Sequence, residues 1–240
     1  MNFINAVISA NKEIYLLLRA NGLQEEFYRS FCKGAGGDIS VGIDIMAENI
    51  FIKHLQKYGT IISEEAGEIK GKKDALIIID PIDGSENLVS GIPYYGTSVA
   101  YMENGKCTQA VIVNLANAEI FIKDGHSFTR GFLGKQKYRD VCINKGAKVG
   151  IFERSYCSKD VATKLKNAQV KYRSPGAFAL SLAYAHDVSF VLYEGKTRIY
   201  DISAGEYMCE NLFCIKKDDI FLVSKDKEIF DKISNIVWNF

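Results

Sequence analysis

Two aspartates stand directly after a long apolar run, three residues apart. Residues 75–79 are all apolar, with Leu76 followed by three isoleucines, which is typical of a strand buried on both faces. We expect that strand to end at Asp80, because Pro81 has no backbone N–H to donate. The carboxylates of Asp80 and Asp83 would repel each other unless a proton or a cation lay between them. Mg²⁺ suits such a position, because it binds carboxylates together with substrate phosphate.

The next two residues could bind an anion at the same turn. Gly84 can adopt backbone angles that other residues resist, and Ser85 is a good N-cap for a short helix through Leu88. Unpaired N–H groups at the start of a helix favour a phosphate. The turn therefore offers both a cation site and an anion site, although Asp-Pro and Asp-Gly are also ordinary turn formers.

Further acids stand at the ends of other predicted elements. Glu64 and Glu65 end a short strand and point to opposite faces of the extended chain, so only one of them can enter a shared site directly. An acidic pair of this kind is also typical of a solvated loop. Asp44 is predicted as the N-cap of a helix over residues 45–57. Asp201 opens a later helix, where we expect its side chain to be exposed.

Composition narrows the class of protein. The chain has 240 residues, enough for one large or two small domains, and its 30 Lys and Arg against 29 Asp and Glu give a formal charge of +1. That balance argues against a nucleic-acid-binding face, which needs concentrated positive charge. Neither a signal peptide nor an apolar run of membrane-spanning length is evident. The six cysteines lack zinc-site spacing, so we expect reduced core thiols in a cytoplasmic protein.

The two halves of the chain differ in their predicted elements. The first begins with a helix from residue 2 that breaks near Asn21, followed by a loop over residues 32–37. A meander follows, with strands over 92–101, 108–113 and 118–123 and loops around an edge strand over 125–148. In the second half, strands over 149–152, 170–172, 188–193 and 220–223 alternate with helices over 159–166, 177–185, from 201 and over 227–237. This pattern indicates layered sheets and helices.

Four separated segments together resemble the inositol monophosphatase family, a group of lithium-sensitive, magnesium-dependent phosphomonoesterases. They are Ser63-Glu64-Glu65, Asp80-Pro81-Ile82-Asp83-Gly84-Ser85 with Asn87 and Gly91-Ile92-Pro93, Tyr200-Asp201-Ile202-Ser203-Ala204-Gly205, and Asp38-Ile39-Ser40 with Asp44. They stand in the family's order over residues 38–205, and their joint occurrence disfavours a mere turn. The resemblance implies one domain over 1–240, an α/β fold in a layered α-β-α-β-α sandwich of the inositol monophosphatase and fructose-1,6-bisphosphatase type. It also implies a metal-binding half over about 1–145, a substrate-side α/β half over about 146–240, and a homodimer.

The resemblance also assigns roles around two Mg²⁺ ions. The implied ligands are Glu64, Asp80 and the carbonyl of Ile82 for the first ion, and Asp80, Asp83 and Asp201 for the second. The N–H groups of Gly84 and Ser85 would bind the phosphate, which a cation-activated water attacks. Glu64 and the Ser85 hydroxyl would accept and orient protons, with Asp44 holding Ser85. Glu65, acting through water, and Asp38 would lie further out, where a third metal could bind.

The substrate contacts that the family implies rest on a weaker resemblance. Glu194 stands seven residues before Asp201, where inositol-binding members place a glutamate, but it fits a loop acid equally well. Arg173 and Gly176 match an R-x-x-G segment that lies beside the substrate in the family. Asp187 and Phe190 stand where the family usually has a glycine and an aspartate, and Tyr200 replaces a more frequent tryptophan. These departures leave open which alcohol is bound.

The function implied by the resemblance is Mg²⁺-dependent hydrolysis of inositol monophosphate or a related sugar phosphate. Fructose-1,6-bisphosphatase activity, alone or in addition, is the main alternative. A 3′-phosphoadenosine 5′-phosphate phosphatase is less favoured, because those enzymes usually carry D-G-T-K where this chain has Gly84-Ser85-Glu86. A non-catalytic member would be expected to lack a metal ligand. As partners we expect a small phosphorylated polyol or sugar, a second copy of the chain, no nucleic acid and no membrane.

Overall fold

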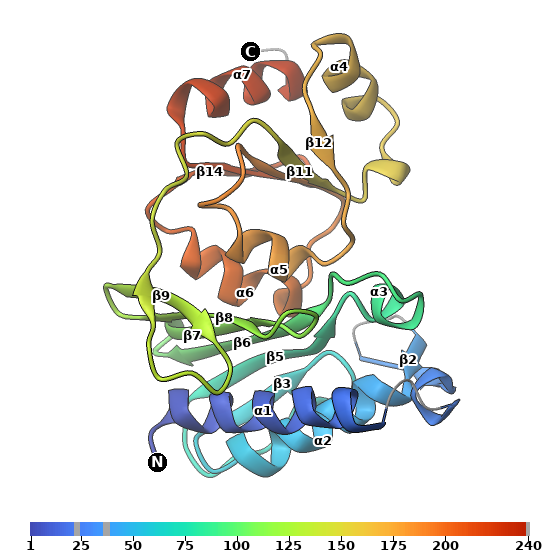
Figure 1. Ribbon diagram of the computed structural model, residues 1–240, viewed down its shortest axis with the longest axis vertical. Coiled ribbons are helices and arrows are strands. Elements are labelled where there is room, and N and C mark those ends of the chain that lie inside the picture. The colour runs from blue at the N-terminus through green and yellow to red at the C-terminus, as the bar shows by residue number, and fades with distance from the viewer. Residues whose placement is uncertain (22–24, 36–38, 239–240) are drawn as a thin grey trace.

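The structure, a computed structural model, describes residues 1–21, 25–35 and 39–238 and is built in five layers (Figure 1). Three pairs of helices alternate with two sheets. From one side to the other the helices are α1 (Phe3–Asn21) and α2 (Gly42–Leu55), then α5 (Phe178–Ala183) and α6 (Ile199–Met208), then α4 (Val161–Asn167) and α7 (Lys227–Trp238). The α-β-α-β-α arrangement expected from the sequence is thereby confirmed.

The first sheet is mixed and has eight strands. Their spatial order is β10 (Arg139–Asp140), β9 (Ser127–Phe132), β8 (Glu119–Asp124), β7 (Lys106–Asn114), β6 (Gly96–Glu103), β5 (Leu76–Asp83), β3 (Thr60–Ser63) and β4 (Gly67–Ile69). Only β3 and β5 run parallel to each other. Their carboxyl ends therefore lie at the same edge of the sheet, and Glu64 follows one of them.

The second sheet has five strands. Their spatial order is β12 (Tyr172–Arg173), β11 (Gly150–Glu153), β13 (Val191–Glu194), β15 (Ile220–Ser224) and β14 (Phe213–Lys217). The first three of these are mutually parallel, so the chain leaves all three at one edge. Strand β14 was not expected from the sequence. The short pair β1 (Ser30–Lys33) and β2 (Ile39–Val41) partly replaces the loop expected at 32–37.

The central strand β5 is buried on both faces, as its composition predicts. Ile77 and Ile79 pack into the core beneath α1 and α2, and Ile78 packs into the core against α5 and α6. The expectation that the strand ends at Asp80 is wrong. Its pairing with β6 is irregular after Asp80 and resumes where Asp83 faces Gly96, so the missing N–H of Pro81 falls in the irregular stretch.

Two helices, α2 and α6, begin earlier than the positions of Asp44 and Asp201 predicted. Helix α2 starts at Gly42 and α6 at Ile199, which makes Asp44 and Asp201 the third residue of each helix. Their carboxylates accept the N–H of the residue before the helix, at 3.0 Å from Val41 and 3.3 Å from Arg198. Asp44 is therefore not the N-cap, and Asp201 is buried, not exposed.

The remaining differences are local. Ser85 is the first residue of α3 (Ser85–Val89), and Gly84 is its N-cap with a φ of 83°. Of the cysteines whose side chains are described, only Cys209 is buried, Cys107 is half-buried and the other three are exposed, so the expectation of core thiols holds for Cys209 alone. Two 3₁₀ turns, Glu25–Tyr28 and Ser155–Cys157, complete the elements. Within the described residues, every helix is too short or too polar to cross a bilayer.

Candidate metal and phosphate site

A pocket of about 630 Å³ lies at the end of β5, between the two halves of the chain. The first half of the chain contributes mainly acidic residues and the turn of Gly84 and Ser85. These lining residues are Asp44, Glu64, Glu65, Asp80, Ile82, Asp83, Gly84, Ser85, Glu86 and Asn87. The second half contributes Glu153, Arg154, Tyr156, Ser174, Pro175, Gly176, Phe178, Tyr193, Lys196, Arg198 and Asp201.

Three buried carboxylates converge in this pocket. Ligand oxygens of Glu64, Asp80 and Asp201 lie within 4.8 Å of one another, and the three residues are only 9%, 3% and 7% exposed. They come from the residue after β3, from β5 and from the first turn of α6. Burial raises the pKa of Asp80 well above its usual value, and the charges of Glu64, Asp83 and Asp201 raise it further. A divalent cation with oxygen ligands would fit this donor set and relieve the repulsion.

Asp83 lies beside these three carboxylates and also accepts a hydrogen bond from outside the acidic site. Its Oδ2 accepts the backbone N–H of Leu180 in α5 at 2.7 Å. Burial raises the pKa of Asp83, the Leu180 hydrogen bond lowers it, and the charges of Asp201 and Glu153 raise it again. The residue therefore joins the acidic site to the helix layer between the sheets.

A cation that was not expected from the sequence lies within the acidic site. The Arg198 guanidinium contacts Glu64 Oε1 at 2.7 Å, and its Nε and Nη2 lie 3.1 Å from the two oxygens of Asp201. Such a bridging guanidinium offsets part of the repulsion between two buried carboxylates. A signal was present in the sequence, because residues three apart at a helix start share one face.

Asp44 carries an unpaired oxygen. Its Oδ2 accepts the Val41 N–H, but among the described residues its buried Oδ1 has no hydrogen-bond partner. Within the described part of the chain, Asp44 and Ser85 are not hydrogen-bonded to each other, and the role of Asp44 in holding Ser85 stays a prediction for which Oδ1 is available. Burial raises the pKa of Asp44 to about 7, aided by the charges of Glu65 and Glu64. A buried acceptor without a partner calls for a ligand or a proton.

The turn after β5 is fixed against the second half of the chain. A Cβ on Gly84 would lie 2.9 Å from the Ala177 Cβ, and the φ of 83° already favours glycine. The Asn87 amide donates to the carbonyls of Tyr94 and Pro175 at 2.7 and 2.6 Å. The turn that carries Gly84 and Ser85 is thus held in one place at the wall of the pocket.

Glu153 is a second pocket residue that was not expected from the sequence. It ends β11, is 1% exposed, and accepts the Gly176 N–H at 2.8 Å and the Ser181 hydroxyl at 2.5 Å. Burial raises its pKa, while these hydrogen bonds lower it. In the sequence, Glu153 is a single acid at the end of an apolar run, as Asp80 is, and this pattern could have identified it. Its hydrogen bonds fix the segment through Gly176, which lines the pocket.

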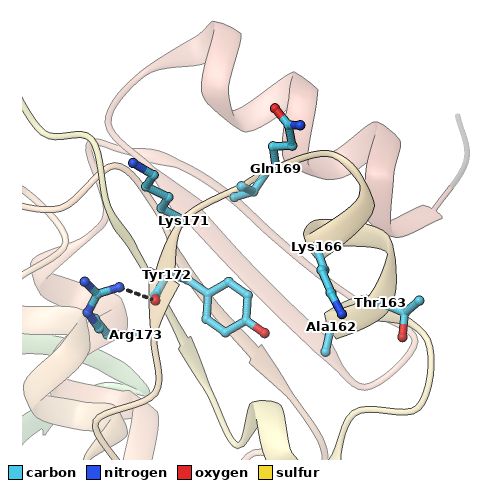
Figure 2. A pocket seen from close by; sticks show the side chains of 8 residues that line it. Ala162, Thr163, Lys166, Gln169, Lys171, Tyr172 and Arg173 are labelled. Carbon is cyan, nitrogen blue, oxygen red and sulfur yellow. Dashed lines mark hydrogen bonds between the residues drawn. The ribbon is translucent and has the colours of Figure 1, made fainter.

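Two of the predicted residues, Arg173 and Glu194, do not line the pocket, and a third cannot be placed. Asp38 lies outside the described residues. Arg173 lines a separate groove between α4 and β12, and Figure 2 shows its side chain across the strand from the Tyr172 ring. Arg173 precedes Ser174 in an extended segment, so the two side chains take opposite sides and only Ser174 lines the pocket. Glu194, at the end of β13, does not line the pocket either, and its Oε2 is buried without a partner among the described residues.

Most of the chain matches known proteins. A sequence model of the inositol monophosphatase family matches residues 7–212. Nus factor SuhB of Xylella fastidiosa is 30% identical over 184 residues, which are 70% of this chain and 64% of that protein. That match spans less than two thirds of the relative's own length.

Two further relatives extend the comparison. Fructose-1,6-bisphosphatase/inositol-1-monophosphatase of Methanocaldococcus jannaschii is 28% identical over 192 residues, covering 76% of this chain and 73% of that protein. Among solved structures, the extragenic suppressor protein suhB from Bartonella henselae aligns with a TM-score of 0.80 over 98% of both chains, at 22% identity. This last similarity establishes the fold alone.

Proposed function

This chain belongs to the inositol monophosphatase family, and from that premise we propose that it is a Mg²⁺-dependent phosphomonoesterase of a phosphorylated polyol or sugar such as inositol monophosphate. The observation that carries the proposal is the convergence of Glu64, Asp80 and Asp201 beside the turn of Gly84 and Ser85. Buried acids that repel one another are costly unless they serve a site. Here they lie in an open pocket, where a cation and a phosphate can reach them.

The proposed ligands follow the family's pattern on the residues that the structure brings together. Glu64, Asp80 and the Ile82 carbonyl would hold one Mg²⁺, and Asp80, Asp83 and Asp201 a second, with Glu65 acting through water toward a third. When bound, these ions would lower the pKa of water and offset charge on the phosphate. Arg198 would have to release Glu64 and Asp201 when a cation binds, because it occupies oxygens of both.

The remaining steps fall to the chain's own groups. The backbone N–H groups of Gly84 and Ser85 would bind the phosphate oxygens at the start of α3. Glu64 and the Ser85 hydroxyl would take and orient the proton of the attacking water. We propose Asp44 as the group that orients the Ser85 hydroxyl, using its unpaired Oδ1. Glu194 and Arg173 do not line the pocket, so their proposed contact with substrate would require a different arrangement of β13 and β12 ends.

A second candidate is hydrolysis of fructose 1,6-bisphosphate. The relative from Methanocaldococcus jannaschii carries both activities in its name, which supports either substrate for this chain. Hydrolysis of 3′-phosphoadenosine 5′-phosphate is a further, less favoured candidate. A non-catalytic member, such as a regulatory subunit, is disfavoured because Glu64, Asp80, Asp83 and Asp201 are all present.

Several accompanying proposals concern the whole protein. They are a homodimer in the cytoplasm without nucleic-acid or membrane partners, and a division of one domain into a metal-binding half over about 1–145 and a substrate-side half over about 146–240. The division is supported by the pocket, whose lining changes character between the two halves.

The proposed function is tested by phosphate release from four esters, with Mg²⁺ and with EDTA. The esters are inositol 1-phosphate, fructose 1,6-bisphosphate, 3′-phosphoadenosine 5′-phosphate and glycerol 2-phosphate. We expect release with Mg²⁺ that EDTA abolishes, and the ranking of rates identifies the alcohol. A folded protein that releases no phosphate from any ester would contradict the proposal.

A further inference from the structure

Glu153 is a buried acid that no cation neutralises. Its side chain is 1% exposed at the end of β11, and across the described residues it forms no ion pair. Instead, its Oε2 accepts the Gly176 N–H at 2.8 Å and its Oε1 accepts the Ser181 hydroxyl at 2.5 Å. Burying a carboxylate is costly even when hydrogen bonds satisfy it. Glu153 is not among the proposed metal ligands, so its place in the pocket wall needs another explanation.

The direction of the hydrogen bonds around Glu153 follows from its charge. A carboxylate can only accept, so the Ser181 hydroxyl donates its single proton to Glu153. The same hydroxyl lies 3.0 Å from the Tyr94 hydroxyl, which must therefore be the donor to Ser181. Tyr94 lies between α3 and β6, Ser181 belongs to α5 and Glu153 to β11. The carboxylate thus ends a chain of hydrogen bonds that joins three parts of the fold beside the pocket.

Residues 174–177, which lead from β12 into α5, are held from two sides. From the first half of the chain, the Asn87 amide donates to the Pro175 carbonyl at 2.6 Å. From the second half, Glu153 accepts the Gly176 N–H. Three of the four residues in this segment line the pocket. Glu153 is therefore one of two groups that fix a part of the pocket wall.

This segment and the helix that follows it are held in different ways. All six residues of α5 are buried, and its Leu180 N–H donates to Asp83 at 2.7 Å. In the segment, by contrast, Ser174 and Gly176 are exposed, so its position depends more on hydrogen bonds than on packing. The bond from the Ser155 N–H to the Ser174 hydroxyl is long, at 3.4 Å. Loss of the carboxylate should therefore shift the segment and leave Asp83 in place.

We propose that Glu153 is a positioning residue for the alcohol part of the substrate, acting through residues 174–177. The proposal rests on the proposed function, because it concerns the alcohol of the ester that is cleaved. The segment meets the turn of Gly84 and Ser85 closely, since a Cβ on Gly84 would lie 2.9 Å from the Ala177 Cβ. Its position therefore sets the space beside the bound phosphate, which the alcohol occupies. Glu153 itself does not touch the reacting atoms.

The experiment compares two esters that differ in their alcohol, inositol 1-phosphate and p-nitrophenyl phosphate. Glu153→Ala should raise KM for inositol 1-phosphate about tenfold, the lower range for a lost hydrogen bond to a charged group. KM for p-nitrophenyl phosphate should stay within about twofold, because its flat alcohol has no hydroxyl groups to align. The apparent affinity for Mg²⁺ should not change. Equal changes in KM for both esters would overturn the proposal, and so would a weaker Mg²⁺ affinity, because Glu153 would then act through Asp83.

Glu153→Gln tests whether the hydrogen bonds, and not the charge, position the segment. Its amide oxygen can still accept the Gly176 N–H, and its NH₂ group can donate to the Ser181 hydroxyl, whose proton then turns toward Tyr94. We expect KM for inositol 1-phosphate within about threefold of the wild-type value. A rise as large as that of Glu153→Ala would overturn the proposal.

Two further variants guard against an effect of folding. Ser181→Ala removes one of the two hydrogen bonds and should raise KM for inositol 1-phosphate about threefold. If Glu153→Ala does not fold, an unchanged KM in Ser181→Ala would overturn the proposal. Glu119→Ala is the matched control, because it removes another buried acid, 8% exposed, that does not line the pocket. It should lower the melting temperature and leave the ratio of the two KM values unchanged.

A binding measurement separates this proposal from the proposed function. Calorimetric titration in Ca²⁺, which takes the same kind of oxygen ligands as Mg²⁺, measures the affinity for inositol 1-phosphate and for inorganic phosphate. We expect Glu153→Ala to weaken binding of the ester about tenfold and to leave binding of inorganic phosphate unchanged. If no ester is hydrolysed but this difference is found, the proposed function fails and the positioning role stands. If esters are hydrolysed but both ligands are affected alike, the positioning role fails and the function stands.

Discussion

The two walls of the pocket differ in burial, in charge and in how they are assembled. The acidic wall consists of Asp44, Glu64, Asp80, Asp83 and Asp201, which are all buried and mutually repelling. The cationic wall consists of Arg154, Tyr193 and Lys196, whose two charges are exposed and lack ion-pair partners among the described residues. Buried like charges raise one another's pKa and create a demand for a cation, whereas exposed cations cost little to keep. Under the proposed function, the acidic wall would supply the chemistry.

The largest expected effect comes from the acidic wall. Asp83→Asn should lower kcat by more than about a hundredfold, since even loss of a residue that only orients a metal ligand costs about ten- to a hundredfold. The melting temperature should stay within a few °C, because the asparagine oxygen can still accept the Leu180 N–H. Steady-state kinetics and thermal melts of the purified variant check both parts. Retained turnover would remove Asp83 from the chemistry.

A second prediction separates proton transfer from metal binding within the same wall. Ser85→Ala should lower kcat by about a hundredfold, the lower range for loss of general acid–base assistance, with less change in the apparent affinity for Mg²⁺. Activity measured over a range of Mg²⁺ concentrations gives both quantities. If the affinity fell more than the rate, Ser85 would be a metal ligand and not a proton acceptor.

Arg198 is a cation that contacts the acidic wall directly, so its removal can be compared with the removal of Arg154 or Lys196. Arg198→Ala should increase the affinity for a divalent cation by roughly three- to tenfold, because the guanidinium no longer occupies Glu64 and Asp201. Electron paramagnetic resonance titration with Mn²⁺ measures the free ion directly.

Lys196→Ala provides the control for that titration, and its Mn²⁺ affinity should stay near that of the wild type. A weaker affinity in Arg198→Ala would show that the arginine positions the carboxylates and does not compete with the cation.

The smallest expected effect is on stability and follows from pKa. Burial raises the pKa of Asp44 from 3.8 to about 7, so the folded state holds a proton that the unfolded state releases at a lower pH. Stability from this group is present below about pH 4 and is lost as pH rises through about 7. In EDTA, the melting temperature should therefore fall by several °C between pH 5 and pH 8.

Repeating the experiment with Mg²⁺ separates the contribution of the pocket carboxylates to the melting temperature from that of other groups. Groups elsewhere titrate equally with and without the ion. His186, which burial holds at a pKa of about 4, acts in the opposite direction and is one such group. The difference in melting temperature between Mg²⁺ and EDTA should grow with pH. A difference that stays constant from pH 5 to pH 8 would mean that the acidic wall does not carry the cation.

The sequence predicted the features that neighbouring residues form and missed those formed by residues distant in the chain. The turn from Asp80 to Ser85 is a contiguous motif, so its acids, its glycine and its place after a buried strand were all evident. Glu153 ends an apolar run and Arg198 precedes Asp201 by three residues, but only the register of β11 and the start of α6 bring these two side chains to the pocket. Arg173 is the opposite case. It matches a family segment in sequence, but its side chain lines a separate groove and not the pocket.

The cationic wall is the clearest example of this limit. Arg154 and Lys196 stand far apart in the chain and are brought together because β11 and β13 are neighbours in the second sheet. The formal charge of +1 gives no sign that buried acids and exposed cations line one pocket. Its detection required the order of the strands, which follows from contacts between segments distant in sequence.

Binding of divalent cations by the carboxylates of the acidic wall can be tested with crystals soaked in Mn²⁺ and data collected at the manganese absorption edge. We predict an anomalous peak within coordination distance of Glu64, Asp80 and Asp201, with Arg198 displaced from both of its carboxylates, and no peak beside Arg154 or Lys196. A map in which Arg198 still contacts Glu64 and Asp201 and no peak lies between these acids would contradict it.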